Sequence, residues 1–305
     1  MLIWSEIMSI EELEILRKKA RNIVLIGILI SVLSAIVVSI LLKSFFALFF
    51  IIVVGLIITI LISVKSTRNF TLAFKETFVL KSLNSVFTDL VYEPEKGLDE
   101  SIIRNTGMMN MGDVYSSNDF ISGKYKNINV IQADVHIEEE HETTDSDGDT
   151  TTTLVTIFKG RWMIFDFNKL FKANIQVSQK GFGNSILSNW GEKIKYKKVM
   201  MEDQAFNNSF RIYAQDEHEA FYILTPSLME KIKKLTGDIS GKLLFCFIDS
   251  KLHIGIQNNK DSFEHSIFTK INEEKVTNEI SQDIKLITNF VDELSLDNDL
   301  FRRGV

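Results

Sequence analysis

The chain has 305 residues, of which 45% are hydrophobic, and a formal net charge of −6 at pH 7. Residues 1–69 carry seven basic and four acidic side chains, a net charge of +3, so the rest of the chain has 27 basic and 36 acidic side chains and a net charge of −9. Because phosphate backbones repel an acidic domain, this distribution disfavours nucleic acid as a partner.

The sequence contains one cysteine, Cys246, which excludes an intramolecular disulfide. It lies within the apolar run Leu243–Ile248, and in such surroundings cysteine behaves as a small buried hydrophobic residue. A free thiol also favours a reducing compartment.

Residues 1–22 are predicted to form an amphipathic segment ahead of the first apolar run. Ile10, Leu13 and Leu16 recur at helical spacing, and Ser9 stands where a helix N-cap is expected. Glutamates near the start of this helix and basic residues near its end suit the helix macrodipole. We expect the segment to lie along the membrane surface or against the soluble domain.

Two apolar runs follow, Ile23–Leu42 and Phe45–Val64, and only Lys43 and Ser44 separate them. Each has 20 uncharged residues, and about 20 apolar residues in a helix cross the hydrocarbon core of a bilayer. Residues 23–64 are therefore predicted to form a transmembrane helical hairpin. Because neither run contains an ionisable residue, a transport pathway through the hairpin is disfavoured. Small residues that favour close helix packing occur in both runs: Gly27, Ser31, Ser34, Ala35, Ser39 and Gly55.

Basic residues gather on one side of the hairpin. Seven of them flank it: Arg17, Lys18, Lys19, Arg21, Lys65, Arg68 and Lys75. Only Lys43 lies in the turn between the runs. Since basic flanks stay on the cytoplasmic side, we expect both termini to be cytoplasmic, with the hairpin in the inner or plasma membrane. Residues 65–305 would then form a cytoplasmic domain.

Beyond the hairpin, helical spacing of apolar residues predicts a helix over Phe70–Leu90, ended by Pro94 and Gly97. A short helix is predicted over Leu98–Asn105. From Tyr115 onward, apolar and polar residues alternate, which is typical of strands with one wet face.

The remaining elements are mostly predicted strands joined as hairpins. A long hairpin has its tip in the acidic stretch 139–149 and returns through Leu154–Phe158 and Trp162–Phe167. Further strands are predicted over Ile175–Val177, Lys193–Met201, Phe210–Ala214, Ala220–Leu224, Leu243–Ile248 and Leu252–Ile256. Thr225 and Pro226 open a helix that Gly237 ends, and apolar spacing from Val276 to Leu294 predicts a long last helix. The fold class is α+β: an N-terminal two-helix transmembrane hairpin followed by a mainly antiparallel β-sheet domain with flanking helices.

Several blocks of the chain resemble successive blocks of one protein family. They are Asp119–Gly123, Phe158–Trp162, Asp166–Phe171, Glu202–Phe210, Ile212–Ala214, Tyr222–Pro226, Leu228–Glu230, Phe263–Glu264 and Asp292–Leu294. In order and content they are similar to a family of bacterial membrane proteins catalogued as domain of unknown function 3137. The resemblance implies two N-terminal spans and a cytoplasmic α+β domain, and it implies no activity. Relatives are often encoded beside LemA-type membrane proteins, so it also implies a membrane-protein partner of that type.

Two segments of the long hairpin carry side chains of the kinds that bind metal ions. Asp145, Asp147 and Asp149 supply oxygen ligands around Gly148, but their spacing does not match a calcium-binding loop, and a polar hairpin tip has the same composition. His136 alternates with glutamates along one strand, and one histidine with one or two carboxylates could hold zinc. A zinc site needs three or four converging ligands, and the sequence shows no ligand spacing typical of such a site. We favour a solvated hairpin in both cases and predict no metal and no cofactor.

The aromatic segment Phe158–Phe171 is a candidate interaction surface. Its candidate contact residues are Lys159, Arg161, Trp162, Asp166 and Lys169. We favour a core position for its aromatic residues, with Asp166 and Lys169 paired at the edge. His218 and His253 are expected to be exposed, and no arrangement of catalytic residues is visible.

The sequence therefore favours a non-catalytic, membrane-anchored binding or scaffold module. The alternatives are a membrane-bound metal-dependent enzyme that uses the His136–Asp149 region, and a structural subunit of a membrane complex.

Overall fold

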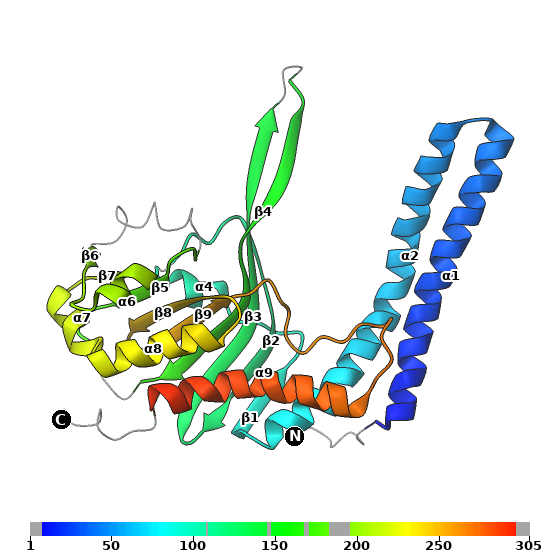
Figure 1. Ribbon diagram of the computed structural model, residues 1–305. Helices are drawn as coiled ribbons and strands as arrows, with labels where there is room; N and C mark the ends of the chain where they lie inside the picture. Colours follow the sequence, from blue (N-terminus) through cyan, green and yellow to red (C-terminus); the bar gives the residue numbers. More distant parts are fainter. Residues whose placement is uncertain (1–7, 108, 145–147, 168–170, 183–195, 297–305) are drawn as a thin grey trace. The chain divides into compact units, whose positions relative to one another are not determined.

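A computed structural model describes residues 8–107, 109–144, 148–167, 171–182 and 196–296. The chain forms two compact units (Figure 1). Unit 1 contains Met1–Ser82 and Phe263–Gln282, and unit 2 contains Leu83–Ser262 and Asp283–Val305. The α+β fold class predicted from the sequence is confirmed, with two long apolar helices followed by an antiparallel sheet and further helices.

Unit 1 is built on two long helices, α1 (Ile10–Leu42) and α2 (Phe45–Phe74). Ser9 caps α1 in a capping box with Glu12, as predicted, and Lys43 ends it in the left-handed region at φ 49°. Both helices are long and apolar enough to cross a membrane. The helix predicted within residues 1–22 is present from Ile10 onward, and it continues into the first apolar run as part of α1.

Small residues let α1 and α2 pack closely. Gly27, Ser31 and Ala35 recur every four residues on α1, and Gly55, Thr59 and Ser63 do so on α2. A Cβ atom at Gly27 would overlap the side chain of Thr59, and one at Gly55 would overlap Ser31. The hydroxyls of Ser31 and Thr59 donate to carbonyls one turn earlier in their own helices, at 2.7 and 2.8 Å. The interface is thus the small-residue type expected between apolar helices.

We expect Gly55→Ala to destabilise unit 1, although alanine normally stabilises a helix relative to glycine by about 0.5–1 kcal/mol. The added methyl group has to displace Ser31, and overpacking of this kind costs about 1–3 kcal/mol. Thermal unfolding of the full chain in detergent should show a lower Tm. The matched control is Gly237→Ala in a later helix, where no atom beyond the neighbouring residues and the local helix backbone lies within 4 Å of the new Cβ, so the Tm should not fall. An unchanged or higher Tm for Gly55→Ala would contradict the close packing.

The helix after α2 ends earlier than predicted. A π-helical stretch η1 (Lys75–Leu80) and a short α3 (Lys81–Asn84) continue it. The chain then forms strand β1 (Thr88–Glu93), so the expectation of a helix to Leu90 is wrong. β1 pairs with the following strand, and this tertiary pairing overrides the helical spacing of its apolar residues.

The segment Phe263–Gln282 packs on the helices of unit 1. Arg17, which is 3% exposed, donates to the carbonyl of Ile267 at 2.7 Å, and the carboxylate of Glu14 accepts from the backbone N–H of Ile271 at 2.8 Å. Arg17 holds the pKa of Glu14 down to about 2. The segment is further fixed by an ion pair between Lys75 and Glu264 at 2.5 Å.

Unit 2 is organised around an antiparallel sheet, which the described residues show with nine strands in the order β1-β2-β3-β4-β9-β8-β5-β7-β6. The strands after β1 are β2 (Val114–Tyr125), β3 (Ile128–Thr144), β4 (Thr150–Asp166), β5 (Ile175–Gln179), β6 (Lys197–Val199), β7 (Phe210–Ala214), β8 (Lys242–Ile248) and β9 (Lys251–Gln257). The predicted β3–β4 and β8–β9 hairpins are confirmed. Residues 193–195 of the predicted extended stretch lie outside the described residues.

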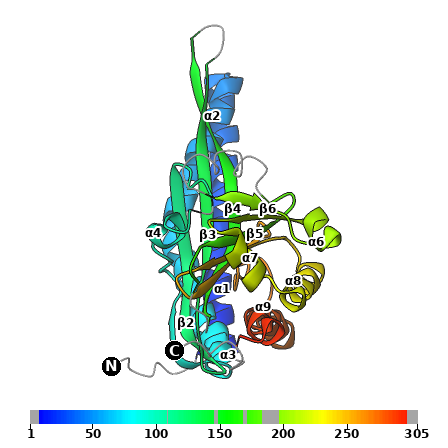
Figure 2. The ribbon, with the colours of Figure 1, turned by 90° about the vertical axis from the view of Figure 1, so that its left-hand side faces the viewer.

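Helices accompany the sheet on both sides (Figure 2). They are α4 (Glu100–Arg104), α6 (Gln204–Ser209), α7 (Glu217–Ile223), α8 (Pro226–Asp238) and α9 (Glu273–Leu294). The predicted strand Ala220–Leu224 is wrong, because Asp216 accepts hydrogen bonds from two backbone N–H groups and so starts α7. The α8 and α9 helices are confirmed, with α8 extending one residue past Gly237.

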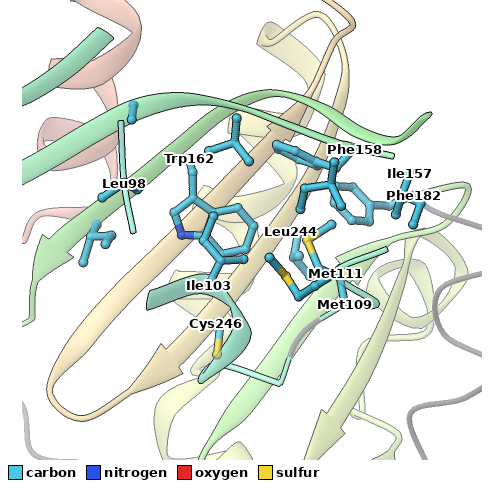
Figure 3. Packing of buried hydrophobic residues seen from close by; sticks show 14 of the residues in the cluster. Leu98, Ile103, Met109, Met111, Ile157, Phe158, Trp162, Phe182, Leu244 and Cys246 are labelled. Atoms are coloured by element: carbon cyan, nitrogen blue, oxygen red, sulfur yellow. The ribbon is translucent and has the colours of Figure 1, made fainter. Parts of the chain in front are cut away.

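One face of the sheet packs against α4 and the residues after it (Figure 3). Trp162 lies beside Phe158 with ring centroids 5.8 Å apart, and Phe158 lies 6.1 Å from Phe182. The opposite face packs against the C-terminal part of α9, where Phe165 lies 6.1 Å from Phe290. The prediction that the aromatic segment belongs to the core is confirmed for its described residues.

Candidate functional site

Charged side chains are buried together on the α9 side of the sheet in unit 2. Asp119 on β2, Asp134 on β3, Arg161 on β4 and Ser262 beyond β9 are each at most 4% exposed. Asp283 on α9 is the fifth member, and its side chain is 37% exposed. We call these five residues the Asp134–Arg161 network. Because burial of an unpaired charge is unfavourable, each of these charged groups needs a hydrogen-bond or ion-pair partner, and the partners show whether the side chains remain available to a ligand.

Strand register and two backbone irregularities assemble the network. Asp134 lies directly opposite Arg161 in the β3–β4 pairing. Gly160, at φ 151°, precedes Arg161, and a Cβ there would overlap the carbonyl oxygen of Ile256 on β9. The β2 pairing shifts register next to Asp119, which has φ 55° and accepts a hydrogen bond from Tyr92 Oη at 2.7 Å. Bulges of this kind redirect a side chain within a sheet.

Ser262 is held between the two charged residues. Its hydroxyl donates to Asp134 Oδ1 at 2.9 Å, and its backbone N–H donates to Asp134 Oδ2. Arg161 Nε donates to the same hydroxyl oxygen. Both carboxylate oxygens of Asp134 are therefore engaged with one residue of the chain.

Arg161 also holds the start of the second half of α9. One terminal nitrogen donates to the carbonyl of Asp283 at 2.9 Å, and the other forms an ion pair with the Asp283 carboxylate at 2.6 Å. Such forked contacts use the planar geometry of the guanidinium. Ser262 is the last residue of unit 2 before the Phe263–Gln282 segment, and Asp283 is the first residue after it. The network thus joins two residues of unit 2 that lie 21 positions apart in the chain, on either side of that segment.

Burial raises the pKa of Asp134 to about 7. Arg161 and the Ser262 N–H oppose this shift, and the nearby Asp119 carboxylate adds to it. The pKa of Asp134 is raised because desolvation disfavours its charged form more than its partners favour it.

A second buried pair, His253 and Cys246, lies on the other face of the sheet. The expectation that His253 is exposed is wrong: it is 5% exposed, and Trp162 Nε1 donates to its Nδ1 at 3.3 Å. Burial lowers the pKa of His253 to about 4 and raises that of the Cys246 thiol far above its usual range. Both groups are neutral at pH 7, so they do not form a thiolate–imidazolium pair. Cys246 is buried, as predicted.

The residues considered from sequence for metal binding do not gather into a site in the described part of the chain. His136 Nε2 lies 3.3 Å from Thr156 Oγ1 and 3.5 Å from a carboxylate oxygen of Glu138. Asp149 is exposed, and Asp145 and Asp147 lie outside the described residues. Among the residues that were described, no group of three or more His, Cys, Asp or Glu side chains could hold a metal ion.

The candidate interaction surface around Phe158–Phe171 divides between core and surface. Arg161 and Trp162 are buried, so neither can contact a partner on the surface. Arg161 belongs to the Asp134–Arg161 network, and Trp162 belongs to the aromatic core. Lys159 is half-buried on β4, and Asp166 accepts from Asn129 Nδ2 at 2.5 Å. Lys169 lies outside the described residues, so its pairing with Asp166 stays a prediction.

Unit 1 contributes two cavities. A groove of about 320 Å³ between α1 and α2 is lined by apolar side chains with Ser31, Ser34 and Thr59. A smaller pocket of about 190 Å³ beside the start of α9 is lined by His265, Lys270 and Glu279 among others. His265 stacks on Phe74 with ring centroids 5.0 Å apart, and burial lowers its pKa.

Residues 156–296 match a family of unknown function. The description of the family model is "Protein of unknown function (DUF3137)", and the matched range begins on β4 and ends beyond α9. It contains Arg161, Ser262 and Asp283, whereas Asp119 and Asp134 precede it.

A search of solved structures finds the crystal structure of the mycobacterial trehalose monomycolate transport factor A, TtfA, at 10% sequence identity and a TM-score of 0.37. The alignment covers 68% of this chain and 88% of that chain. No curated protein matches the chain.

Proposed function

We propose that this protein is a membrane-anchored, non-catalytic binding or scaffold module. The α1–α2 hairpin is the anchor, and residues 65–305 act on the cytoplasmic side. The observation that carries the proposal is the Asp134–Arg161 network, whose charged groups bind the chain's own Ser262 and Asp283. A catalytic acid or base has to reach a substrate proton, and these side chains are buried and occupied.

The surface of the two long helices supports the anchor. In their most apolar windows only 11% and 6% of the residues are buried by the rest of the chain. A core helix of a soluble protein would bury most of such a window, so these side chains need lipid or another apolar partner around them. The basic residues that flank the hairpin support the cytoplasmic orientation.

The experiment that tests the proposal is crosslinking in native cells, followed by purification of the full chain in mild detergent. We expect a partner protein at a defined stoichiometry, and the resemblance noted above makes a LemA-type membrane protein the first candidate. A structural role in a membrane complex would give a complex that survives without crosslinking. The control is the α1–α2 hairpin alone with the same tag, which should not retain the partner.

Recovery of the chain alone under all these conditions would contradict a binding module. A stoichiometric metal ion in the purified protein would also contradict it, if the ion were lost in His136→Ala and Asp149→Asn variants. That result would favour the metal-dependent enzyme.

A further inference from the structure

The β3–β4 hairpin continues beyond the rest of the sheet as a two-stranded ribbon (Figure 1). We call Glu138–Thr144 with Thr150–Thr156 the β3–β4 arm. Its strands pair from Glu138 opposite Thr156 to Thr144 opposite Thr150. The β2 pairing ends at Glu138, and the β9 pairing ends at Gly160, so no described strand flanks the arm.

The two edges of the arm differ in how far they are closed. On the β3 side, Asp113 N–H donates to the carbonyl of Glu138, and the Asp113 carboxylate accepts from the N–H of Glu140, both at 2.9 Å. On the β4 side the last contact is Gln257 Nε2, which donates to the carbonyl of Ile157 at 3.1 Å. Beyond it, the edge of Thr150–Thr156 is open to solvent along its whole length.

This open edge has none of the features that protect natural edge strands. It contains no proline and no lysine, and its sequence of five threonines, a leucine and a valine has high β-propensity. Leu154 is 52% exposed and Val155 is 48% exposed, on opposite faces of the ribbon. Because a two-stranded ribbon is marginal in water, a third strand on this edge would stabilise it.

We propose that the edge Thr150–Thr156 binds an extended segment of a partner protein that carries Lys or Arg at alternate positions. Residues 138–156 contain seven acidic side chains and no Lys or Arg. Glu138, Glu140 and Glu142 alternate along β3 and so share one face of the arm. A strand added to β4 lies about 10 Å from β3, and Lys or Arg side chains are long enough to pass Thr152, Leu154 and Thr156, which lie opposite these glutamates, and reach them.

The same charges argue against other occupants. An acidic segment would meet like charges, and pairing between the β4 edges of two copies would bring two acidic β3 strands to about 14 Å from each other with no basic side chain between them. The inference rests on the proposed function, because it names the class of partner that a binding module would take. The mode is strand addition, in which backbone hydrogen bonds supply affinity and side chains supply specificity.

The test titrates a peptide of alternating Lys and Thr, as long as the edge, onto the full chain in detergent and measures binding by fluorescence anisotropy. We expect binding that weakens with salt and exceeds that of an alternating Glu–Thr peptide by about tenfold or more. Replacing Glu140 and Glu142 by Gln should remove most of that preference.

The backbone part of the inference is tested with Thr152→Pro. The N–H of Glu140 points away from β4, so the opposite residue Leu154, and Thr152 two positions along, direct their N–H groups outward. Proline at Thr152 therefore removes a donor that the β3–β4 ladder does not use, and peptide affinity should fall about tenfold. Thr152→Ala keeps the donor and should bind as the unmodified chain does; equal circular dichroism and Tm for the two variants establish that the fold is retained.

No binding of the Lys–Thr peptide, equal binding of the Glu–Thr peptide, or unchanged binding by Thr152→Pro would overturn the inference. A concentration-dependent dimer that Thr152→Pro abolishes would assign the edge to a second copy instead. If Thr152→Pro kept the crosslinked cellular complex, the arm would be excluded as the docking site while the proposed function would stand.

Discussion

Replacing Arg161 with methionine is expected to destabilise unit 2 by about 3 kcal/mol, because removing one partner of a buried ion pair leaves the other charge uncompensated. Asp134 would remain buried without its neighbouring cation, and Ser262 and Asp283 would each lose a hydrogen bond from the guanidinium. The value lies at the lower end of the usual range because the Asp283 side chain is 37% exposed.

Urea unfolding of the full chain and hydrogen exchange of its amides would measure this effect. Amide exchange rates should increase most in α9 from Asp283 onward and at Ser262, where Arg161 makes its contacts. Arg161→Lys keeps the charge but not the fork, so we expect an intermediate loss of about 1–2 kcal/mol.

The matched control is Lys159→Met, two residues earlier on the same face of β4. Its side chain is half-buried, and among the described residues it has no hydrogen bond or ion pair, in contrast to that of Arg161. We expect a change within about 0.5 kcal/mol. Equal effects of Arg161→Met and Lys159→Met would show that the network does not hold Ser262 and Asp283 in place.

The elements that could be predicted from sequence depend on neighbouring residues. The ends of α1 and α2 follow from Ser9, Lys43 and Ser44, and the start of α8 follows from Thr225 and Pro226. Each signal is a helix cap, a turn residue or a periodic spacing of apolar residues, and each can be recognised within a few residues of sequence. The same locality explains the errors: Ala220–Leu224 has strand composition, but the cap at Asp216 lies just outside it.

The candidate site could not be predicted because its partners are far apart in the chain. Ser262 lies 128 residues from Asp134, and Asp283 lies 122 residues from Arg161. In sequence, Asp134 is one polar position in an alternating strand, and that pattern is read as a wet face. The face is dry here because α9 and the chain near Ser262 cover it. The local signals were Asp119, which begins the first block that resembles the family, and Arg161, which lies in the block Phe158–Trp162.

The pH dependence of stability should separate Asp134 from the buried histidine. In the folded protein Asp134 keeps its proton up to about pH 7, whereas its ordinary pKa is 3.8. Between these values the folded state binds the extra proton, so the free energy of unfolding falls as pH rises, by at most about 1.4 kcal/mol per pH unit. His253 acts in the opposite direction: with its pKa lowered to about 4 from 6.5, it contributes stability that rises with pH across that interval.

From about pH 5 to 6.5 the contributions of Asp134 and His253 oppose each other, so the stability of the unmodified chain should change less steeply with pH than it would with Asp134 or His253 alone. Asp134→Asn removes the falling contribution, so its stability should rise with pH over about 5 to 6.5. His253→Gln should show the reverse, a steady fall to about pH 7. His265, whose pKa is also lowered, contributes in the same direction as His253 and is common to all three chains.

The informative quantity is the difference in unfolding free energy between the unmodified chain and Asp134→Asn, because the histidine contributions cancel in it. Between about pH 5 and 7.5 the unmodified chain should lose about 2–3 kcal/mol of unfolding free energy relative to Asp134→Asn. Urea titrations at each pH would measure it, and working above pH 5 leaves Glu14 ionised throughout. A difference that does not vary with pH would mean that Asp134 is ionised in the folded state, and that Arg161 and Ser262 together outweigh its burial.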